Sequence, residues 1–357
     1  MYIKLWSLPP AEKIFEPEQN WTILDKFPIY RLQLNDNEAS FHKKVELPFQ
    51  GRAFDLLSYL LAEHEEEIRS YSPAAIYIGS ARGELGTLTE AIIAYERGEK
   101  PSPRLSPQTS AGSLASVVAQ YLGVQGPALV ISQTCLSGLA ALHAASLFLK
   151  AGEGDTVLFG AVEAPLVPFF IETMAALRIY TQQKEYPFSR PGDTAQINSF
   201  ALGEGAVLGV LSEKPISPFR LLNVKVRTAP PRSGMAFSAV DEEAVAHLLS
   251  EIRSKPDFVL LHAPGTRQGD TAEWHAVSQV WGDLPALSIK GLIGHSLGAA
   301  PLLGLAAALY LLQKQKWYFP PYPTLWPQRA PHRWKEAVVI GLGYGGVMGA
   351  IQIKYEP

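Results

Sequence analysis

A strand that runs almost directly into a helix is predicted at residues 127–142, which read PALVISQTCLSGLAAL. Branched apolar side chains come first, a polar triplet and one cysteine follow, and the sequence then becomes rich in alanine and leucine. The short apolar run predicts a buried strand, and the longer segment predicts a helix. Another apolar run, Asp155–Gly160, follows the helix. Strand, helix and strand in this order predict parallel pairing with a right-handed crossover, so we expect an α/β fold.

Cys135, at the junction of this strand and helix, is the only cysteine in the 357 residues. A single cysteine excludes a disulfide framework and a multi-cysteine zinc site. At a helix start, the free N–H groups and the macrodipole favour the thiolate, which is the nucleophilic form of the side chain. Because most lone cysteines are small buried side chains, the position of Cys135 alone leaves a structural role and a nucleophilic role both open.

The chain is too long for one ordinary core, so we expect two fused halves. The proline-containing segment Lys214–Pro218 is the best candidate boundary, which places the N-terminal half at residues 1–215 and the C-terminal half at residues 216–357. The formal net charge of −3 argues against a nucleic-acid-binding protein. The first residues show no signal peptide, and no apolar run is long enough for a membrane span. We therefore expect a cytoplasmic protein.

The second half contains an echo of the cysteine segment. Residues 285–300 read PALSIKGLIGHSLGAA: they also begin with Pro-Ala-Leu, run through a short strand and present a reactive side chain before a small-residue helix. Gly138 follows Cys135 by three residues, and Gly298 follows His295 by three residues. If a pseudo-twofold axis relates the halves, Cys135 and His295 lie at the starts of two facing helices. Chance similarity between alanine-rich segments is the alternative.

Another histidine, His262, follows the apolar strand Phe258–Leu261 and opens a turn that contains Gly265. In open α/β sheets, chemistry collects at the carboxyl ends of the strands. Cys135, His262 and His295 together supply a nucleophile and two imidazoles, which are the groups that acyl transfer through a thioester requires.

Six motifs in a fixed order carry a resemblance to a known family. They are Cys135–Gly138, Gly160–Pro165, Leu202–Ala206, His262–Glu273, Lys290–Ala300 and Gly343–Gly346. Over residues 109–353 the chain resembles the β-ketoacyl-acyl-carrier-protein synthases of the elongating Cys-His-His type, members of the thiolase superfamily. The resemblance implies a thiolase-like α/β fold with two pseudo-symmetric βαβαβαββ halves in a layered α/β/α/β/α arrangement.

The resemblance also implies roles for the site residues. Cys135, with a pKa lowered by the helix start, would accept an acyl group, and the backbone N–H groups of Cys135 and Tyr344 would form the oxyanion hole. Tyr344 stands where the family usually has phenylalanine. His262 and His295 would stabilise the enolate that forms when a malonyl thioester loses carbon dioxide. The implied reaction is a decarboxylative Claisen condensation in fatty-acid, polyketide or polyene-type biosynthesis.

Supporting roles are implied for Lys290, Glu273, Thr266 and Asp270. Lys290 would pair with Glu273 and order the site, and a purely structural ion pair is the alternative. The resemblance implies no bound cofactor and no metal ion, because the substrates are carried on the phosphopantetheine of an acyl carrier protein. That carrier is one expected partner. The other is a second subunit, in a homodimer or in a heterodimer with a related ketosynthase.

The sequence departs from the family pattern at several places. Ala263-Pro264 replaces the usual Gly-Thr, which removes a hydroxyl that would meet the pantetheine arm, and Val347-Met348 replaces a Thr-Asn. Residues 1–70 are atypical and lack the expected glycine-rich first strand, and the chain is short for the family. A non-catalytic partner subunit of the chain-length-factor kind is therefore the alternative, although such partners usually lose the nucleophile. A degradative thiolase would need a second cysteine, which this chain lacks.

Overall fold

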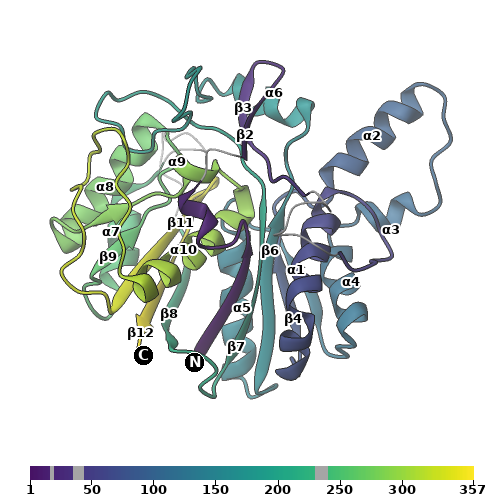
Figure 1. Ribbon diagram of the computed structural model, residues 1–357, viewed down its shortest axis with the longest axis horizontal. Helices are drawn as coiled ribbons and strands as arrows, with labels where there is room; N and C mark the ends of the chain where they lie inside the picture. The colour runs from purple at the N-terminus through teal and green to yellow at the C-terminus, as the bar shows by residue number, and fades with distance from the viewer. Residues whose placement is uncertain (17–19, 35–43, 230–239) are drawn as a thin grey trace.

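The structure, a computed structural model, describes residues 1–16, 20–34, 44–229 and 240–357. It consists of two halves that repeat the same order of strands and helices (Figure 1). The core elements of the first half are β1 (Tyr2–Leu8), α1 (Arg52–Ser70), β4 (Ile76–Gly79), α4 (Ser113–Leu122), β5 (Ala128–Ile131), α5 (Ser137–Lys150), β6 (Thr156–Glu163) and β7 (Gly205–Ser212). Those of the second half are β8 (Phe219–Thr228), α7 (Glu242–Ser250), β9 (Phe258–Leu260), α8 (Arg267–Trp281), β10 (Ala286–Leu287), α10 (Ala300–Lys314), β11 (Glu336–Gly343) and β12 (Val347–Tyr355).

Smaller elements decorate this core. They are η1 (Lys13–Phe15), β2 (Trp21–Leu24), β3 (Phe27–Tyr30), α2 (Leu85–Glu96), α3 (Leu105–Thr109), α6 (Pro168–Ala176), α9 (Lys290–Ile293) and η3 (Leu297–Ala299). In Figure 1, α2 and α3 form an arm that extends away from the body of the first half.

Each half forms a mixed five-stranded sheet with the same pairing pattern. In the N-terminal half the strand order is β5-β4-β6-β7-β1, with β4 parallel to both neighbours and β7 antiparallel to both. In the C-terminal half the order is β10-β9-β11-β12-β8, with β9 parallel to both neighbours and β12 antiparallel to both. One residue pair, Tyr2 opposite Arg220, joins the sheets where β1 meets β8. The predicted pseudo-symmetric βαβαβαββ halves are confirmed.

Two helices, α5 and α10, lie between the sheets. α5 contacts β4 and β6 of one sheet and β8 and β12 of the other, while α10 contacts β7 and β11. On the outer faces, α1 and α4 cover the first sheet, and α7 and α8 pack together over the second. Among the described residues, the run Leu297–Lys314 is the one helical segment long and apolar enough to cross a membrane, but 83% of it is buried inside the protein. Such burial is expected of a core helix that is apolar on all sides.

A first strand is present at the N-terminus, and it contains no glycine, in keeping with the absence of a glycine-rich first strand from residues 1–70. β1 pairs with β7 over all seven of its residues. Its side chains Ile3 and Leu8, which lie on opposite faces of the sheet, are both almost completely buried. Because the strand is stabilised by apolar burial and by ladder hydrogen bonds rather than by glycine, a glycine-based motif does not reveal it.

The β2–β3 hairpin forms a separate two-stranded sheet close to the segments that carry the site. The alternation of apolar and polar side chains at Ile29–Leu34 is typical of an edge strand, but β3 ends at Tyr30. It pairs with β2, and one isolated bridge joins Tyr30 to Gly203. The Trp21 Nε1 donates a hydrogen bond to the Leu292 carbonyl at 2.8 Å, and the Tyr30 N–H donates to the Leu202 carbonyl at 3.0 Å. The hairpin therefore stabilises loops from both halves.

The two central helices meet at a pair of glycines related by the pseudo-twofold axis. Gly138 lies in the first turn of α5, and Gly298 lies in η3, directly before α10. A Cβ on Gly138 would lie 2.8 Å from the Gly298 carbonyl oxygen and 2.9 Å from the Ala161 Cβ. Only a residue without a side chain permits this approach of two backbones. The starts of the two helices face each other, as the similarity between residues 127–142 and 285–300 predicts.

We expect Gly138→Ala to lower the free energy of unfolding by about 1–3 kcal/mol, because the added methyl group overpacks the helix contact. The matched control is Gly112→Ala, since a Cβ at Gly112 meets only the Ser110 Oγ, at 3.8 Å. Urea unfolding followed by tryptophan fluorescence measures both variants. Equal unfolding midpoints for the two would contradict the close contact.

Candidate active site

Cys135 lies in a tight turn between β5 and α5. Thr134 adopts a left-handed conformation with φ of 49°, which a β-branched residue rarely does. The Ser137 hydroxyl stabilises the turn, because it accepts the Gln133 N–H at 2.9 Å and donates to the Thr134 carbonyl at 2.7 Å. The turn leaves Cys135 partly accessible at the wall of a cavity.

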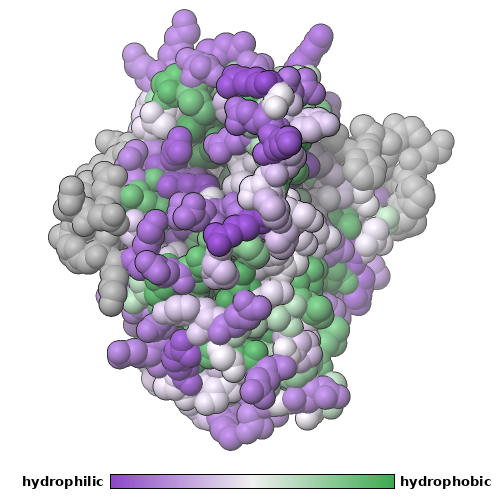
Figure 2. All heavy atoms as spheres, turned by 90° about the vertical axis from the view of Figure 1, so that its right-hand side faces the viewer, coloured by the Kyte–Doolittle hydropathy of each residue, from purple (hydrophilic) through white to green (hydrophobic). Residues whose placement is uncertain are grey.

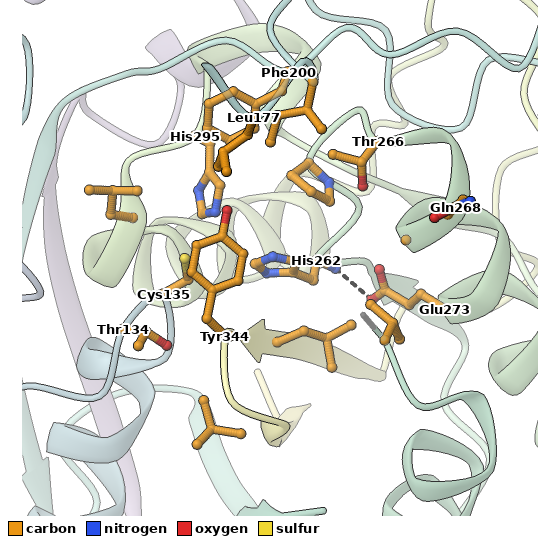
Figure 3. Close-up of a pocket in the computed structure, with 18 of the residues that line it drawn as sticks. Thr134, Cys135, Leu177, Phe200, His262, Thr266, Gln268, Glu273, His295 and Tyr344 are labelled. Carbon is orange, nitrogen blue, oxygen red and sulfur yellow. Dashed lines mark hydrogen bonds between the residues drawn. The ribbon is translucent and has the colours of Figure 1, made fainter. Parts of the chain in front are cut away.

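This cavity has a volume of about 750 Å³. His262, His295 and Tyr344 line it together with Cys135, and their side chains point toward one another (Figure 3). His262 follows β9 and His295 follows β10 and α9, so both histidines come from the second half, whereas the cysteine comes from the first. The structure thus brings together the cysteine and the two imidazoles that sequence reasoning placed in one site.

The two histidine rings are adjacent, with centroids 5.1 Å apart and ring planes at 82°. Both residues are buried, with exposed fractions of 7% and 3%. Burial, assisted by the charge of Lys290, lowers the pKa of His262 and of His295 well below 6.5. Both imidazoles are therefore neutral at pH 7, and each keeps one N–H donor. Neither Nδ1 atom has a hydrogen-bond partner among the described residues.

The segment before β7 holds His295 in place. The backbone N–H of His295 donates a hydrogen bond to the Ala201 carbonyl at 2.8 Å, and the His295 carbonyl accepts the backbone N–H of Gly203 at 3.2 Å. Phe200 packs edge-on against the imidazole with ring centroids 5.6 Å apart. These contacts fix both the backbone and the ring of His295, so one of the six sequence motifs serves to position another.

The expectation that the helix start lowers the pKa of Cys135 is wrong. Burial raises the pKa of this thiol to about 12; the charges of Lys290 and Arg82 lower it in part, and Glu163 raises it further. Loss of solvation around the thiolate thus outweighs the charges that favour it. At pH 7 the protein therefore holds a thiol, and attack on a thioester requires a proton acceptor. The two neutral imidazoles of the same cavity meet that requirement.

Lys290 and Glu273 are both buried, but they do not form the predicted direct ion pair within the described part of the chain. Glu273 instead accepts the N–H groups of His262 and Ala263 through its two carboxylate oxygens, each at 2.7 Å. Burial raises the pKa of Glu273 and lowers the pKa of Lys290, and each charge opposes the shift of the other. Glu273 therefore orders the His262 loop through backbone hydrogen bonds, and Lys290 acts on the site through its charge.

Asp270 holds the loop that follows His262. Its carboxylate accepts the N–H groups of Gly192 at 2.7 Å, Gly265 at 3.2 Å and Thr266 at 3.1 Å. Burial raises its pKa to about 7. Thr266 begins α8 and lines the cavity (Figure 3). Asp270 therefore supports the loop from outside the cavity, while Thr266 borders the space that a ligand would fill.

Tyr344 belongs to the tight turn between β11 and β12, in which Gly345 and Gly346 have positive φ angles. The turn lies against the cysteine, because a Cβ on Gly343 would be 3.5 Å from the Cys135 nitrogen. Among the described residues, the turn and loop hydrogen bonds use neither the Cys135 N–H nor the Tyr344 N–H as a donor to another backbone group. Both amides are therefore available for the oxyanion hole that the resemblance implies.

Sequence reasoning missed two residues beside the site. Glu163, at the end of β6, is completely buried; it accepts the Ala81 N–H, and burial raises its pKa to about 8. Arg82 lines the cavity and stacks on the Phe170 ring at 4.6 Å. Glu163 belongs to one of the six motifs, which was a usable signal. For Arg82 the only signal was its position just after the carboxyl end of β4.

A pseudo-symmetric fold with a nucleophile from one half and two imidazoles from the other is that of the thiolase-like acyltransferases. Residues 61–215 match the β-ketoacyl synthase N-terminal domain, and residues 226–322 match the β-ketoacyl synthase C-terminal domain. The chain belongs to the β-ketoacyl synthase family.

Individual relatives match large parts of the chain. A putative polyketide β-ketoacyl synthase 1 from Streptomyces cyaneus is 30% identical over 78% of this chain and 74% of its own length. The ketoacyl synthase alpha subunit of the tetracenomycin polyketide synthase from Streptomyces glaucescens is 31% identical over 67% of this chain and 62% of its own length. The solved complex of a ketosynthase with its chain length factor from Xenorhabdus doucetiae contains a chain that matches with a TM-score of 0.81 and 17% identity, over 99% of this chain and 98% of that chain. At this identity the structural match shows the fold alone.

Because Cys135 is the only cysteine, alkylation by iodoacetamide, followed by intact-protein mass spectrometry, reports its thiolate directly. A pKa of about 12 predicts slow alkylation at pH 7 and a rate that rises through alkaline pH. Burial lowers the pKa of Lys290 to about 8, so the lysine is charged at pH 7. Since this charge stabilises the thiolate, Lys290→Met should slow alkylation at pH 7 by about tenfold, which corresponds to one pKa unit. The difference in alkylation rate between the wild type and Lys290→Met should become smaller at higher pH, where Lys290 loses its proton.

The control for this measurement is Lys214→Met, which removes the charge of a lysine that is 74% exposed in its side chain and pairs with Asp155 on the surface. Its alkylation rate should equal that of the wild type. Alkylation of Lys290→Met that is as fast as in the wild type would contradict the electrostatic role of Lys290.

Proposed function

We propose that the protein catalyses the decarboxylative Claisen condensation of an acyl thioester with a malonyl thioester. The observation that carries the proposal is the one cavity shared by Cys135, His262 and His295, with both imidazoles neutral. A nucleophile and two hydrogen-bond donors around a common space suit a reaction that first forms an acyl-enzyme and then stabilises an enolate.

In the first half-reaction, Cys135 attacks the carbonyl carbon of the acyl thioester. The thiol proton passes to a neutral imidazole and then to the departing pantetheine sulfur. The cysteine thus becomes an acyl thioester, and the pantetheine thioester becomes a free thiol. The N–H groups of Cys135 and Tyr344 donate to the oxygen of the tetrahedral intermediate, and each such donor stabilises the transition state by about 3 kcal/mol. The nearby charge of Lys290 favours the thiolate as it forms.

In the second half-reaction, His262 and His295 donate hydrogen bonds to the thioester carbonyl of the malonyl group. Loss of carbon dioxide leaves an enolate, and the buried donors stabilise its negative oxygen more strongly than water-exposed donors would. The enolate carbon attacks the carbonyl of the acyl group on Cys135. The cysteine thiolate leaves and takes up one proton from water, and a β-ketoacyl thioester remains on the carrier.

Both substrates would arrive on the phosphopantetheine arm of an acyl carrier protein in the cytoplasm, without a cofactor or metal ion held by the chain. The arm contains amide groups, which need hydrogen-bond partners when they enter a cavity. Asn198, Thr266 and Gln268 line the cavity and can supply such partners. The similarity to polyketide synthases supports a polyketide or a related chain as the product.

A non-catalytic partner subunit of the chain-length-factor kind is less well supported. Such a subunit needs no nucleophile, whereas this chain keeps Cys135, both histidines and two available amides around one cavity. Similarity to chains in ketosynthase and chain length factor complexes concerns the shared fold, so it does not favour either role.

His295→Ala should separate the two half-reactions. With acyl and malonyl thioesters of an acyl carrier protein, we expect condensation to fall by at least about 100-fold, because one donor to the enolate is lost. Acylation of Cys135 should largely survive, since His262 remains as a proton acceptor. Intact-protein mass spectrometry measures the acyl-enzyme, and release of carbon dioxide measures condensation.

Cys135→Ala is the control that should lose the acyl adduct completely. Loss of both acylation and condensation in His295→Ala would contradict the roles assigned here. A wild-type protein that accepts no acyl group of any length would contradict the proposed activity and favour the partner-subunit alternative.

For the second expected partner, we propose that the face carrying β5 and α2 binds another subunit of the same fold. α2 has no buried residue, yet it presents Leu88, Ile92, Ile93 and Tyr95 with exposed fractions of 39%, 54%, 46% and 66%. β5 is the outer strand of its sheet, and its Leu129 is 51% exposed. Apolar areas are visible among polar ones on this face in Figure 2. A free strand edge beside exposed apolar side chains favours association with a partner.

We expect sedimentation equilibrium at micromolar concentration to show a dimer for the wild type and a monomer for Ile92→Glu, because the new charge would be buried without a partner at the interface. Phe319→Glu is the matched control, since Phe319 is 52% exposed but lies in the second half. A wild-type monomer would exclude the homodimer and leave a related ketosynthase subunit as the partner. A dimer that persists in Ile92→Glu would contradict this interface.

A further inference from the structure

We propose that Arg82 selects the acyl group, favouring chains that carry an oxygen acceptor, such as an oxo group or a carboxylate, over saturated alkyl chains. The inference rests on the proposed function, because it concerns the acyl group that Cys135 receives. Arg82 follows β4 and lines the same cavity as Cys135. A guanidinium has five N–H donors, so a ligand that fills this cavity is bound best when it carries a hydrogen-bond acceptor.

Arg82 lies on the apolar side of the cavity. Four buried side chains of one hydrophobic cluster line this side: Phe170, Met174, Phe200 and Leu297. Cys135 packs against the same cluster. Because burial of apolar surface is favourable, an acyl chain attached to Cys135 gains most free energy by extending along these side chains. That path brings the chain past the Arg82 guanidinium.

The guanidinium is stacked rather than paired. Its Cζ lies over the Phe170 ring, 4.6 Å from the ring centroid, and a cation–π contact of this kind uses none of the N–H donors in a hydrogen bond. No ion pair or side-chain hydrogen bond of Arg82 is formed with any residue that the structure describes. Its donors are therefore open to a ligand in the cavity.

The backbone of Arg82 is fixed close to the reacting centre. Buried Glu163 accepts the N–H group of Ala81, the residue directly before Arg82. Burial raises the pKa values of Cys135, Glu163 and Tyr344, and the positive charge of Arg82 opposes each rise. Since Arg82 and Cys135 line one cavity, the guanidinium can reach an acyl chain that is attached to the cysteine.

The energetics favour an oxygenated chain. A saturated chain that covers the guanidinium removes water from a charged group and returns no hydrogen bond, which is unfavourable. An oxo oxygen or a carboxylate accepts from the N–H edge and compensates for the lost water. The proposed condensation itself produces 3-oxoacyl chains, so an unreduced product that re-enters the site would carry the acceptor that Arg82 needs.

The test compares acylation of Cys135 by three eight-carbon pantetheine thioesters: octanoyl, 3-oxooctanoyl and the half-thioester of suberic acid. Rates are measured by intact-protein mass spectrometry for the wild type, Arg82→Met and Arg82→Lys. We expect the wild type to accept at least one oxygenated chain about tenfold faster than octanoyl, the effect of one hydrogen bond to a charged group. Arg82→Met should lose this preference, and Arg82→Lys should retain part of it.

A preference for 3-oxooctanoyl identifies an oxo oxygen as the acceptor, and a preference for the suberyl chain identifies a carboxylate; either supports the inference. Equal rates with all three chains in the wild type, or an unchanged preference in Arg82→Met, would overturn it while leaving the proposed function intact. Absence of acylation by every thioester in all three proteins would instead overturn the proposed function, and the inference with it.

Discussion

The approach of Gly138 to Gly298 is the contact on which the site depends. Each glycine follows a chemically important side chain by three residues, Cys135 in one half and His295 in the other. Because neither glycine has a Cβ, the starts of α5 and α10 come within backbone contact across the pseudo-twofold axis. The turns that precede these helices therefore face one cavity. A side chain at either glycine would separate the helices and, with them, the nucleophile and the imidazole.

Around this contact, the protein buries several ionisable side chains. Glu163, Asp270 and Glu273 are almost completely buried, and they accept backbone N–H groups of loops beside the cavity. Burial of carboxyl groups is costly, but here each one holds a loop in a single arrangement. Burial keeps the imidazoles neutral, and the buried positive charge of Lys290 assists it and also favours the thiolate. The structural and the electrostatic functions are thus carried by different residues.

The fold class and the main site residues could be predicted from the sequence because they leave local signals. The similarity between residues 127–142 and 285–300 indicated two related halves, and Cys135 and His262 stood out at the carboxyl ends of strands. β1 was missed because its stability comes from pairing with a strand about 200 residues away. The hydrogen bonds of Glu273 were missed because its partners are backbone N–H groups, which nearly every residue has, so the sequence does not show which ones it binds. The raised pKa of Cys135 depends on burial, which only the folded chain defines.

The two halves share a topology, but the turn that carries Cys135 is less deeply buried than the equivalent turn that carries His295. This difference suits the two turns to different chemistry. β5 is partly exposed and Cys135 remains accessible from the cavity, whereas β10 is buried and His295 is only 3% exposed. A nucleophilic thiol must be accessible to its thioester substrate, and the cavity beside it must have space for an acyl chain. An imidazole that acts as a neutral donor must instead be kept from water, because burial lowers its pKa. The same turn, repeated in two environments, thus presents an accessible thiol in one half and a buried neutral imidazole in the other.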